Sequence, residues 1–224
     1  MKRYLLLIFL LIPIVHAVGV TPSSQNLNFK PNLEQDLQFS FFPTGTNTNI
    51  KISLSGDLAK YAAIDKDFLE GGGTVTVKLS LPSKLESGWH YVNVHGSEQP
   101  LSGEGITTAT GITVPIRIFV PFVGKHIEAS LDIPNLNVND RGKVIINVKN
   151  IGTEDISTLY AKISITSNEA EVKKFETKKI PLKQEESQTL EATFTTSNLT
   201  QGKYKVIAAI IFDNNQKSLE KEFF

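Results

Sequence analysis

The chain has 224 residues, and removing the first 17, which form a candidate export signal, leaves 207. Apolar residues make up 40% of the chain and charged residues 21%, a composition that can build a hydrophobic core and excludes a disordered chain. Lys and Arg total 23, as do Asp and Glu; without Lys2 and Arg3 the net charge is −2. This balance gives no indication of a nucleic acid or an anionic membrane as a partner. The length favours two domains over one.

The first 17 residues have the three parts of a secretory signal peptide. Met1 is followed by Lys2 and Arg3, residues 4–15 are apolar, and residues 15–17 end in Ala17 at the position where a signal peptidase cuts. As a helix this apolar run reaches about 18 Å, against a hydrocarbon core of about 30 Å, so we expect cleavage rather than a retained anchor. The protein is therefore expected to be extracytoplasmic: secreted, on the cell surface or in a periplasm-like space, with no integral membrane span after signal cleavage.

From residue 20 onward, apolar residues recur at every second position, which predicts β-strands with one buried and one wet face. In the first half these runs centre on residues 37–41, 50–54, 75–81 and 88–94. Turn-forming residues separate the runs, and residues 57–66 are the one candidate for a helical turn. This pattern is typical of a β-sandwich.

The last run of the first half spans residues 112–122 and is the longest. One face carries Ile112, Val114, Ile116, Ile118, Val120 and Phe122, and the other carries Thr113, Pro115, Arg117, Phe119 and Pro121. Because proline has no N–H to donate, we expect this strand at a sheet edge or at a bulge. An open edge here could pair with an incomplete partner subunit by β-augmentation.

The pattern pauses at residues 123–125, and a second set of alternating runs begins at Ile127. These runs cover residues 127–133, 144–148, 159–165, 190–194, 204–212 and 219–223. We therefore predict an all-β protein: two tandem immunoglobulin-like antiparallel β-sandwich domains, residues 18–123 and 124–224, after an N-terminal signal peptide at residues 1–17.

The two halves share a weak internal repeat. Residues 85–92 align with residues 199–206, with matching Leu, Gly and Val, and each segment lies between two alternating runs. A Leu-x-x-Gly-x-Tyr-x-Val turn is typical of immunoglobulin-like sandwiches, where the Tyr hydroxyl bonds to backbone of the preceding loop. The repeat predicts a structural corner at Gly202 and Tyr204, and it places a core-facing His90 where the second copy has Tyr204.

The second half resembles the CARDB-like (cell-adhesion-related) immunoglobulin-like domains of archaeal and bacterial surface proteins. The residues that carry the resemblance are 147–156, with the Asn-Ile-Gly-Thr turn, and 202–206, which close the same domain. The resemblance spans residues 126–224 and implies an extracellular, non-catalytic role without identifying functional residues.

The first half resembles two other groups. Residues 55–59, 88–94 and 106–116 resemble sandwich domains of prokaryotic surface proteins, including the peptidoglycan-side module of WxL-interacting proteins. Residues 81–87, followed by Trp89 and Asn93, are similar to the signature of periplasmic pilus chaperones. That signature has Asp where this chain has Lys84, and its aromatic-to-Asn spacing is one residue shorter.

The sequence contains no motif of a catalytic or metal site. The absence of cysteine excludes disulfides, thiolate metal ligands and a cysteine nucleophile. His90 and His95 would point to opposite faces of one strand, which does not suit a shared metal. Asp65 and Asp67 precede glycines but do not complete a calcium loop. We expect no catalytic, cofactor-binding or metal-binding residues and no enzyme activity; a hydrolase with a scattered site is the alternative.

Trp89 and Tyr91 are the candidate contact surface. They share a strand face opposite Val92 and Val94, so they are exposed if those valines face the core. Exposed aromatic pairs can stack on sugar rings or pack against protein, but the same face could also lie beneath a neighbouring loop. The expected partner is a protein or a cell-envelope polysaccharide. Asn198 begins the one N-x-S/T sequon and is the candidate glycosylation site.

These expectations lead to one main functional hypothesis and one alternative. The main hypothesis is an exported, non-catalytic binding or structural module of the cell surface or envelope, with a role in adhesion or assembly. The alternative is a periplasmic-type assembly chaperone that acts by β-strand donation.

Overall fold

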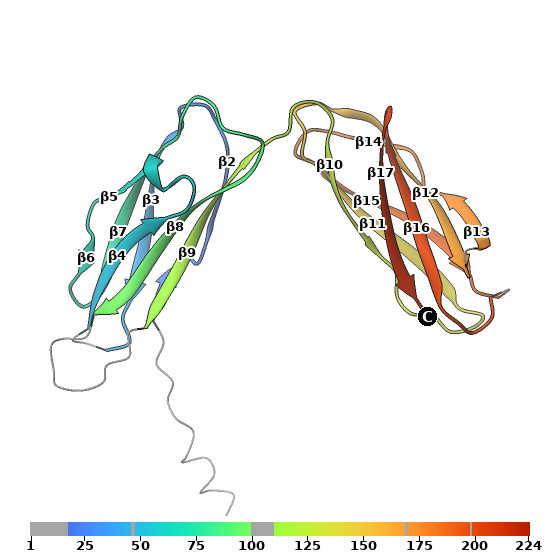
Figure 1. Cartoon of the computed structure of the whole chain (residues 1–224), viewed down its shortest axis with the longest axis horizontal. Helices are drawn as coiled ribbons and strands as arrows, with labels where there is room; N and C mark the ends of the chain where they lie inside the picture. Colours follow the sequence, from blue (N-terminus) through green and yellow to red (C-terminus); the bar gives the residue numbers. More distant parts are fainter. Residues whose placement is uncertain (1–17, 46–47, 100–109, 169, 198) are drawn as a thin grey trace, which may run out of the picture. The chain divides into compact units, whose positions relative to one another are not determined.

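The computed structural model describes residues 18–45, 48–99, 110–168, 170–197 and 199–224, and these residues form an all-β protein. The chain divides into two compact units, of which the first ends at Val120 and the second begins at Pro121 (Figure 1). The predicted signal peptide at residues 1–17 and the predicted glycosylation site Asn198 lie outside the described residues.

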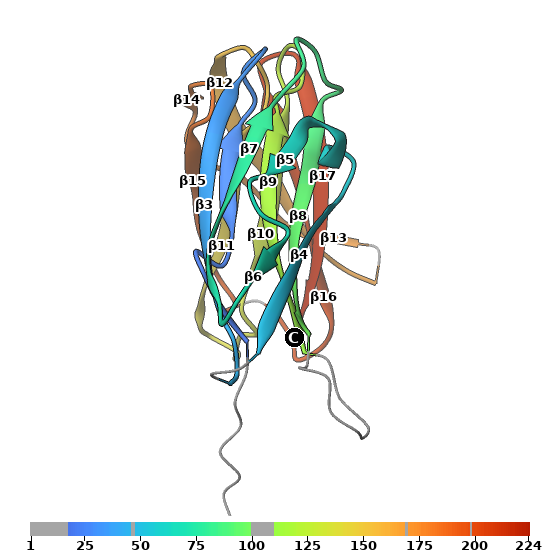
Figure 2. The ribbon, with the colours of Figure 1, turned by 90° about the vertical axis from the view of Figure 1, so that its left-hand side faces the viewer.

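The first unit consists of two sheets. One sheet has the order β1-β3-β7-β5, with β1 at Gly19–Thr21, β3 at Glu34–Phe42, β7 at Gly73–Ser80 and β5 at Ala62–Ile64. The other has the order β2-β9-β8-β4-β6, with β2 at Gln25–Asn28, β9 at Gly111–Val120, β8 at Gly88–Gln99, β4 at Asn49–Ser55 and β6 at Phe68–Leu69. A 3₁₀ turn, η1, occupies Ala59–Tyr61 between β4 and β5 (Figure 2).

The core of the first unit lies between these sheets and is built by the alternation seen in the sequence. Phe39 and Val77 from one sheet, and Val94 and Ile116 from the other, are at most 1% exposed. The side chains between them along each strand point outward, because successive residues of a strand face opposite sides.

The strand that begins at Ile112 is not at an edge, so that expectation is wrong. β9 pairs antiparallel with β8 along its whole length without a register shift, and parallel with β2 over residues 116–119. Pairing with β2 begins one residue after Pro115, and Pro121 lies beyond the end of the strand. Neither proline therefore lies within the ladder to β2. Among the described residues of β9, 111–115 and Val120 have no strand paired on the β2 side.

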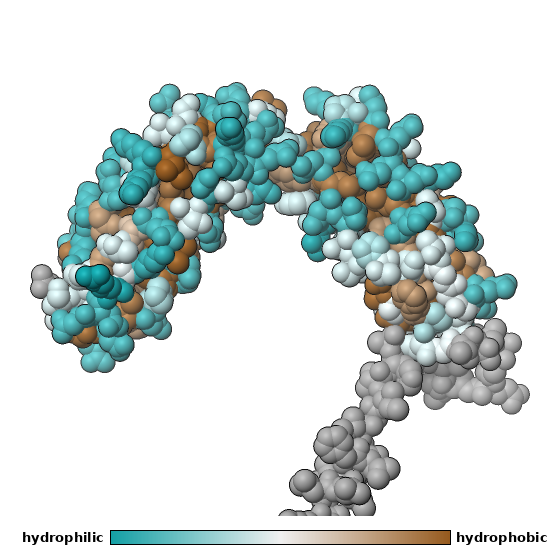
Figure 3. All heavy atoms as spheres, turned by 180° about the vertical axis from the view of Figure 1, so that it is seen from behind, coloured by the Kyte–Doolittle hydropathy of each residue, from teal (hydrophilic) through white to brown (hydrophobic). Residues whose placement is uncertain are grey.

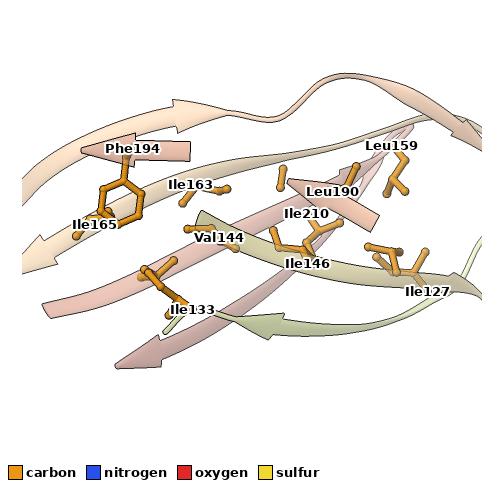
Figure 4. Packing of buried hydrophobic residues seen from close by; sticks show 14 of the residues in the cluster. Ile127, Ile133, Val144, Ile146, Leu159, Ile163, Ile165, Leu190, Phe194 and Ile210 are labelled. Carbon is orange, nitrogen blue, oxygen red and sulfur yellow. The ribbon is translucent and has the colours of Figure 1, made fainter. Parts of the chain in front are cut away.

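The second unit also consists of two sheets. One has the order β10-β11-β15, with β10 at Ile127–Asp132, β11 at Arg141–Asn150 and β15 at Ser187–Thr195. The other has the order β13-β12-β16-β17, with β13 at Ala170–Glu176, β12 at Ile156–Ser167, β16 at Tyr204–Phe212 and β17 at Asn215–Phe223; β14, at Ile180–Leu182, also pairs with β12. Side chains of both sheets, including Val144, Leu190, Ile163 and Ile210, fill the space between them (Figure 4).

The segment predicted as a linker, residues 123–125, is bonded to the turn after β11. The Phe122 N–H donates to Ile151 O (3.0 Å), and the Thr153 N–H is 2.9 Å from both Phe122 O and Gly124 O. The Gly124 N–H donates to Thr153 Oγ1 at 2.9 Å. These bonds explain why the second compact unit begins at Pro121, three residues before the predicted boundary. We therefore propose that this segment belongs to the second domain.

The turn that receives this segment is itself held by Asn150, whose side chain is buried. Its Nδ2 donates to Glu154 O at 2.8 Å and to Leu182 O at 3.4 Å, and its Oδ1 accepts the Gly152 N–H at 3.0 Å. A Cβ at Gly152 would overlap Gly124 O and lie 2.7 Å from His126 N. The turn therefore requires both the amide of Asn150 and the absence of a side chain at Gly152.

Candidate functional site

Trp89 and Tyr91 lie near the start of β8 and point away from the core of the first unit. Their side chains are 45% and 39% exposed, whereas Val92 and Val94 are fully buried. Exposed hydrophobic residues alone are not unusual here, because hydrophobic residues also lie among the hydrophilic ones on the face drawn in Figure 3. The distinguishing feature of Trp89 and Tyr91 is that they are neighbours on one strand face.

The pairing of β8 with β9 places two further residues beside them. Trp89 lies opposite Phe119, and their ring centroids are 4.9 Å apart with the rings tilted by 50°. Tyr91 lies opposite Arg117, which is exposed. We call Trp89, Tyr91 and Phe119 the aromatic cluster; Arg117 lies at its side.

Most of the remainder of this sheet face is polar; the exceptions are Pro115 on β9 and Phe68 on β6, which is 44% exposed. Asn93 lies opposite Pro115 on one side and Ser55 on the other. His95 uses both ring nitrogens: Nδ1 is 2.8 Å from Thr113 Oγ1 and Nε2 is 2.5 Å from Ser55 Oγ. This imidazole is therefore held by its neighbours and has no nitrogen left for a substrate.

The two copies of the internal repeat form equivalent corners. In the second unit, Tyr204 is 6% exposed, its hydroxyl donates to Thr200 O at 2.7 Å, and its ring stacks on Phe223 with centroids 5.6 Å apart. Gly202 does not have a left-handed φ, and a Cβ there would meet open space. The corner therefore depends on Tyr204, and glycine is not required at position 202.

In the first unit the corner residue is His90. Its Nε2–H donates to Glu86 O at 2.8 Å, and its Nδ1 lies 2.5 Å from Asp57 Oδ2. The other oxygen of Asp57 accepts the Tyr91 N–H at 2.7 Å. The side chain of His90 is 16% exposed, so the residue lies at the rim of the core and not inside it.

This pair favours the charged form of both residues. Burial lowers the pKa of His90, but the bonds to Glu86 O and to the Asp57 carboxylate outweigh it and raise the pKa above its ordinary value. Burial raises the pKa of Asp57, but the Tyr91 N–H and His90 outweigh it and lower the pKa. Because both ring nitrogens face acceptors, His90 acts as a structural clamp and not as a catalytic base.

A cleft of about 550 Å³ lies at the end of the second unit, beside the Tyr204 corner. Its apolar walls include Leu136, Leu199 and Phe223. Among the described side chains that line it, the titratable ones are Lys203 and Tyr204, so no carboxylate or imidazole side chain is present to form an acid–base pair.

The described residues also bear on metal binding and on membrane insertion. Within the described ranges, no three His, Cys, Asp or Glu side chains come together as metal ligands. Asp65, considered above for a calcium loop, accepts the Thr76 N–H at 2.7 Å. In the same part of the chain, no helix has the length and apolar character needed to cross a bilayer.

Comparison with known proteins gives similarities of fold only. No family model matches the chain, and no curated protein matches it. The CARDB domain of a Pyrococcus furiosus protein, solved in complex with di-metal ions, is 18% identical over 46% of this chain and 90% of that one, with a TM-score of 0.36. The class 5 fimbriae chaperone CfaA is 12% identical over 93% of this chain and 99% of that one, with a TM-score of 0.38.

The E. coli chaperone DraB is similar in the same way, at 8% identity over 92% of this chain and 98% of that one, with a TM-score of 0.39. Scores and identities this low do not assign a family. The neighbours include a CARDB domain and chaperones, two of the groups that the sequence resembles. The likeness to WxL-interacting proteins stays a prediction.

Sequence reasoning identified Trp89 and Tyr91 but not their neighbours. Phe119 and Arg117 were assigned to the outward side of residues 112–122, which is where they lie. Their position beside Trp89 and Tyr91 depends on the register between β8 and β9. The alternation of residues along one strand does not determine its register with another strand. Residues 88–94 and 112–122 are consecutive alternating runs, and consecutive strands often pair, which was the available signal for this contact.

Proposed function

We propose that this protein is an exported, non-catalytic binding module of the cell surface or envelope, and that Trp89 and Tyr91 contact its partner. The observation that carries the proposal is the aromatic cluster. Trp89 and Tyr91 remain substantially exposed on one sheet face, next to Phe119. Aromatic side chains contribute most when such a face becomes covered, because they bury a large apolar area at a small cost in side-chain entropy.

A binding role is also supported by how the polar groups near the cluster are used. Both nitrogens of His90 and both nitrogens of His95 have hydrogen-bond partners within the protein. A general base needs a free nitrogen directed at its substrate. The contacts of His90 and His95 therefore favour a structural role over a catalytic one.

The alternative of an assembly chaperone rested on the two-domain length, which the binding module shares, and on an open strand at residues 112–122. β9 already has partners on both sides over residues 116–119. The remaining stretch, residues 111–115, would offer a partner strand about half the length of β9. The alternative therefore loses the feature that distinguished it, and we retain the binding module.

The proposal is tested on the native protein in its host and on the chain from residue 18 onward. Fractionation should find the native protein outside the cytoplasm, and the purified chain should sediment with envelope fragments of that cell. The double variant W89A/Y91A should reduce this sedimentation by about tenfold or more, as expected for central aromatic contacts. Phe42→Ala is the matched control, because Phe42 is 54% exposed on β3, in the other sheet of the same unit.

Two results would contradict the proposal. One is a native protein confined to the cytoplasm. The other is envelope binding that W89A/Y91A and Phe42→Ala leave equally intact.

A further inference from the structure

The sheet face that carries the aromatic cluster has an unusual charge distribution. The outward positions of β2, β4, β8 and β9 carry two permanently charged side chains, Lys51 and Arg117, and no carboxylate. Glu98, the one acidic residue within these four strands, faces inward and is 5% exposed. The chain as a whole has equal numbers of acidic and basic residues, so this face differs from the average of the molecule.

Other exposed sheet faces of the molecule mix both signs. On β3, in the opposite sheet of the first unit, Glu34 and Asp36 are outward, and Asp36 lies opposite Lys78. In the second unit, exposed lysines pair with glutamates at 2.8 to 3.3 Å, as in Lys203 with Glu222 and Lys205 with Glu220. Among the described residues, Arg117 has no such partner. Its guanidinium is therefore available to an anionic group of a ligand.

We propose that this face binds an acidic polysaccharide, with sugar rings stacked on Trp89 and Tyr91 and a sugar carboxylate paired with Arg117; the proposal rests on the binding function proposed above. Residues two apart on a strand are about 7 Å apart, so each of these two aromatic residues can receive its own sugar ring. Arg117 is directly opposite Tyr91 and their Cβ atoms are about 5 Å apart across the strand pair, so a guanidinium on this side chain can reach a group bound at the Tyr91 ring.

The polar residues on the same face favour a hydroxyl-rich ligand over a protein. Next to the aromatic cluster are the amides of Asn93 and Asn26 and the hydroxyl of Ser55, each half-buried or exposed. Side chains of this kind both donate and accept hydrogen bonds, as sugar hydroxyls do. A stable protein interface would need a larger apolar centre than three rings bordered by amides.

Affinity electrophoresis of the chain from residue 18 onward tests the proposal. The probes are three acidic polysaccharides of different linkage (polygalacturonate, alginate and hyaluronate), each beside its carboxyl-reduced, uncharged counterpart. We expect at least one acidic polymer to retard the protein in the gel. The carboxyl-reduced counterpart of that polymer should retard it much less. Arg117→Gln should weaken that binding about tenfold, as expected for the loss of a charge-assisted hydrogen bond.

Matched variants separate this effect from general changes in charge or folding. Arg141→Gln removes the same charge from an exposed position of β11 in the second unit and should leave binding unchanged. Tyr91→Ala should reduce binding without altering the far-ultraviolet circular dichroism spectrum, because its side chain lies outside the core.

Several results would overturn the proposal. Equal retardation by acidic and reduced polymers would mean that the ligand is neutral. Equal losses in Arg117→Gln and Arg141→Gln would mean that binding follows net charge alone. If no polysaccharide retards the protein, while envelope sedimentation depends on Trp89 and Tyr91 and is abolished by protease treatment of the fragments, the partner is a protein. The proposed function would then stand without this inference.

Discussion

His90 occupies in the first unit the corner position that Tyr204 occupies in the second. Each side chain donates to the backbone carbonyl four residues upstream, His90 to Glu86 at 2.8 Å and Tyr204 to Thr200 at 2.7 Å. An imidazole changes its charge in the physiological pH range. The corner of the first unit is therefore expected to respond to pH.

The first prediction is that the His90–Asp57 pair stabilises the first unit in a limited pH window. Since the pKa of His90 is raised, its contribution is complete below the ordinary value of 6.5 and is lost as the pH rises through the pKa of the folded state. Since the pKa of Asp57 is lowered, its contribution is present above 3.8 and is lost as the pH falls through the folded pKa.

Denaturant unfolding followed by tryptophan fluorescence checks this prediction, because Trp89 is the one tryptophan of the chain and reports on the first unit. The midpoint should be lower at about pH 8.5 than at about pH 5.5. His90→Gln keeps an N–H donor but does not titrate, so it should remove most of this difference. A difference that is unchanged in His90→Gln would assign the pH dependence to other groups.

The second prediction concerns Tyr204. Tyr204→Phe loses the bond to Thr200 O and should cost about 1 kcal/mol, near the low end for a hydrogen bond because Thr200 is exposed and water can replace the donor. Tyr204→Ala also leaves a cavity against Phe223 and should cost about 3 to 5 kcal/mol. Calorimetry is the appropriate measurement, since the second unit has no tryptophan.

Lys203→Ala and Lys205→Ala are the controls for Tyr204. Their ion pairs with Glu222 and Glu220 are exposed, so each substitution should change the free energy of unfolding by no more than about 1 kcal/mol. A neutral Tyr204→Phe together with a costly Lys203→Ala would show that the inner and outer faces of β16 have been assigned the wrong way round.

The third prediction compares two glycines of the second unit. Gly152→Ala should destabilise this unit by about 1 to 3 kcal/mol, because the new methyl group would overlap Gly124 O and force the backbone apart. Gly202→Ala should be close to neutral, since its Cβ would meet open space and its φ is not left-handed. Equal thermal midpoints for the two variants would contradict this account of the turn.

The fourth prediction concerns Asn150. Asn150→Ala removes three hydrogen bonds and leaves the Gly152 N–H without its acceptor in a buried place, which should cost about 2 kcal/mol or more. Asn147→Ala, an exposed change on the same strand, should cost less than about 1 kcal/mol despite the loss of the Thr189 hydroxyl bond. Unfolding of both variants by denaturant provides the comparison.

Alternation along the chain was sufficient to predict the all-β fold and most of the core. Val114, Ile116 and Ile118 follow the predicted inward face and are fully buried. Short strands such as β2, with the sequence QNLN, and β13, with the sequence AEVKKFE, were not identified. Such strands are short or at sheet edges and bury little apolar surface. They therefore lack the alternation of apolar and polar residues that identifies a strand in the sequence.

The missing β2 also explains the wrong expectation for β9. Prolines indicate an edge strand only when no neighbouring strand is known on that side. The parallel neighbour of β9 is β2, which lies about ninety residues earlier in the chain, in a segment without a strand pattern. For the same reason, the contact between His90 and Asp57, 33 residues apart, could not be inferred. Alternation determines which way a side chain points, and pairing determines what it meets.

The attachment of residues 122–124 to the turn after β11 has a mechanical consequence. A pulling force that enters the second unit from its N-terminal side first loads the bonds from Phe122 to Ile151 and from Thr153 to Phe122 and Gly124, before it reaches β10. Because several of these bonds share the load, the entry point should resist peeling better than a single bond would. If the protein is held in a cell envelope under shear, as proposed above, these bonds should delay unfolding of the second unit from its N-terminal end.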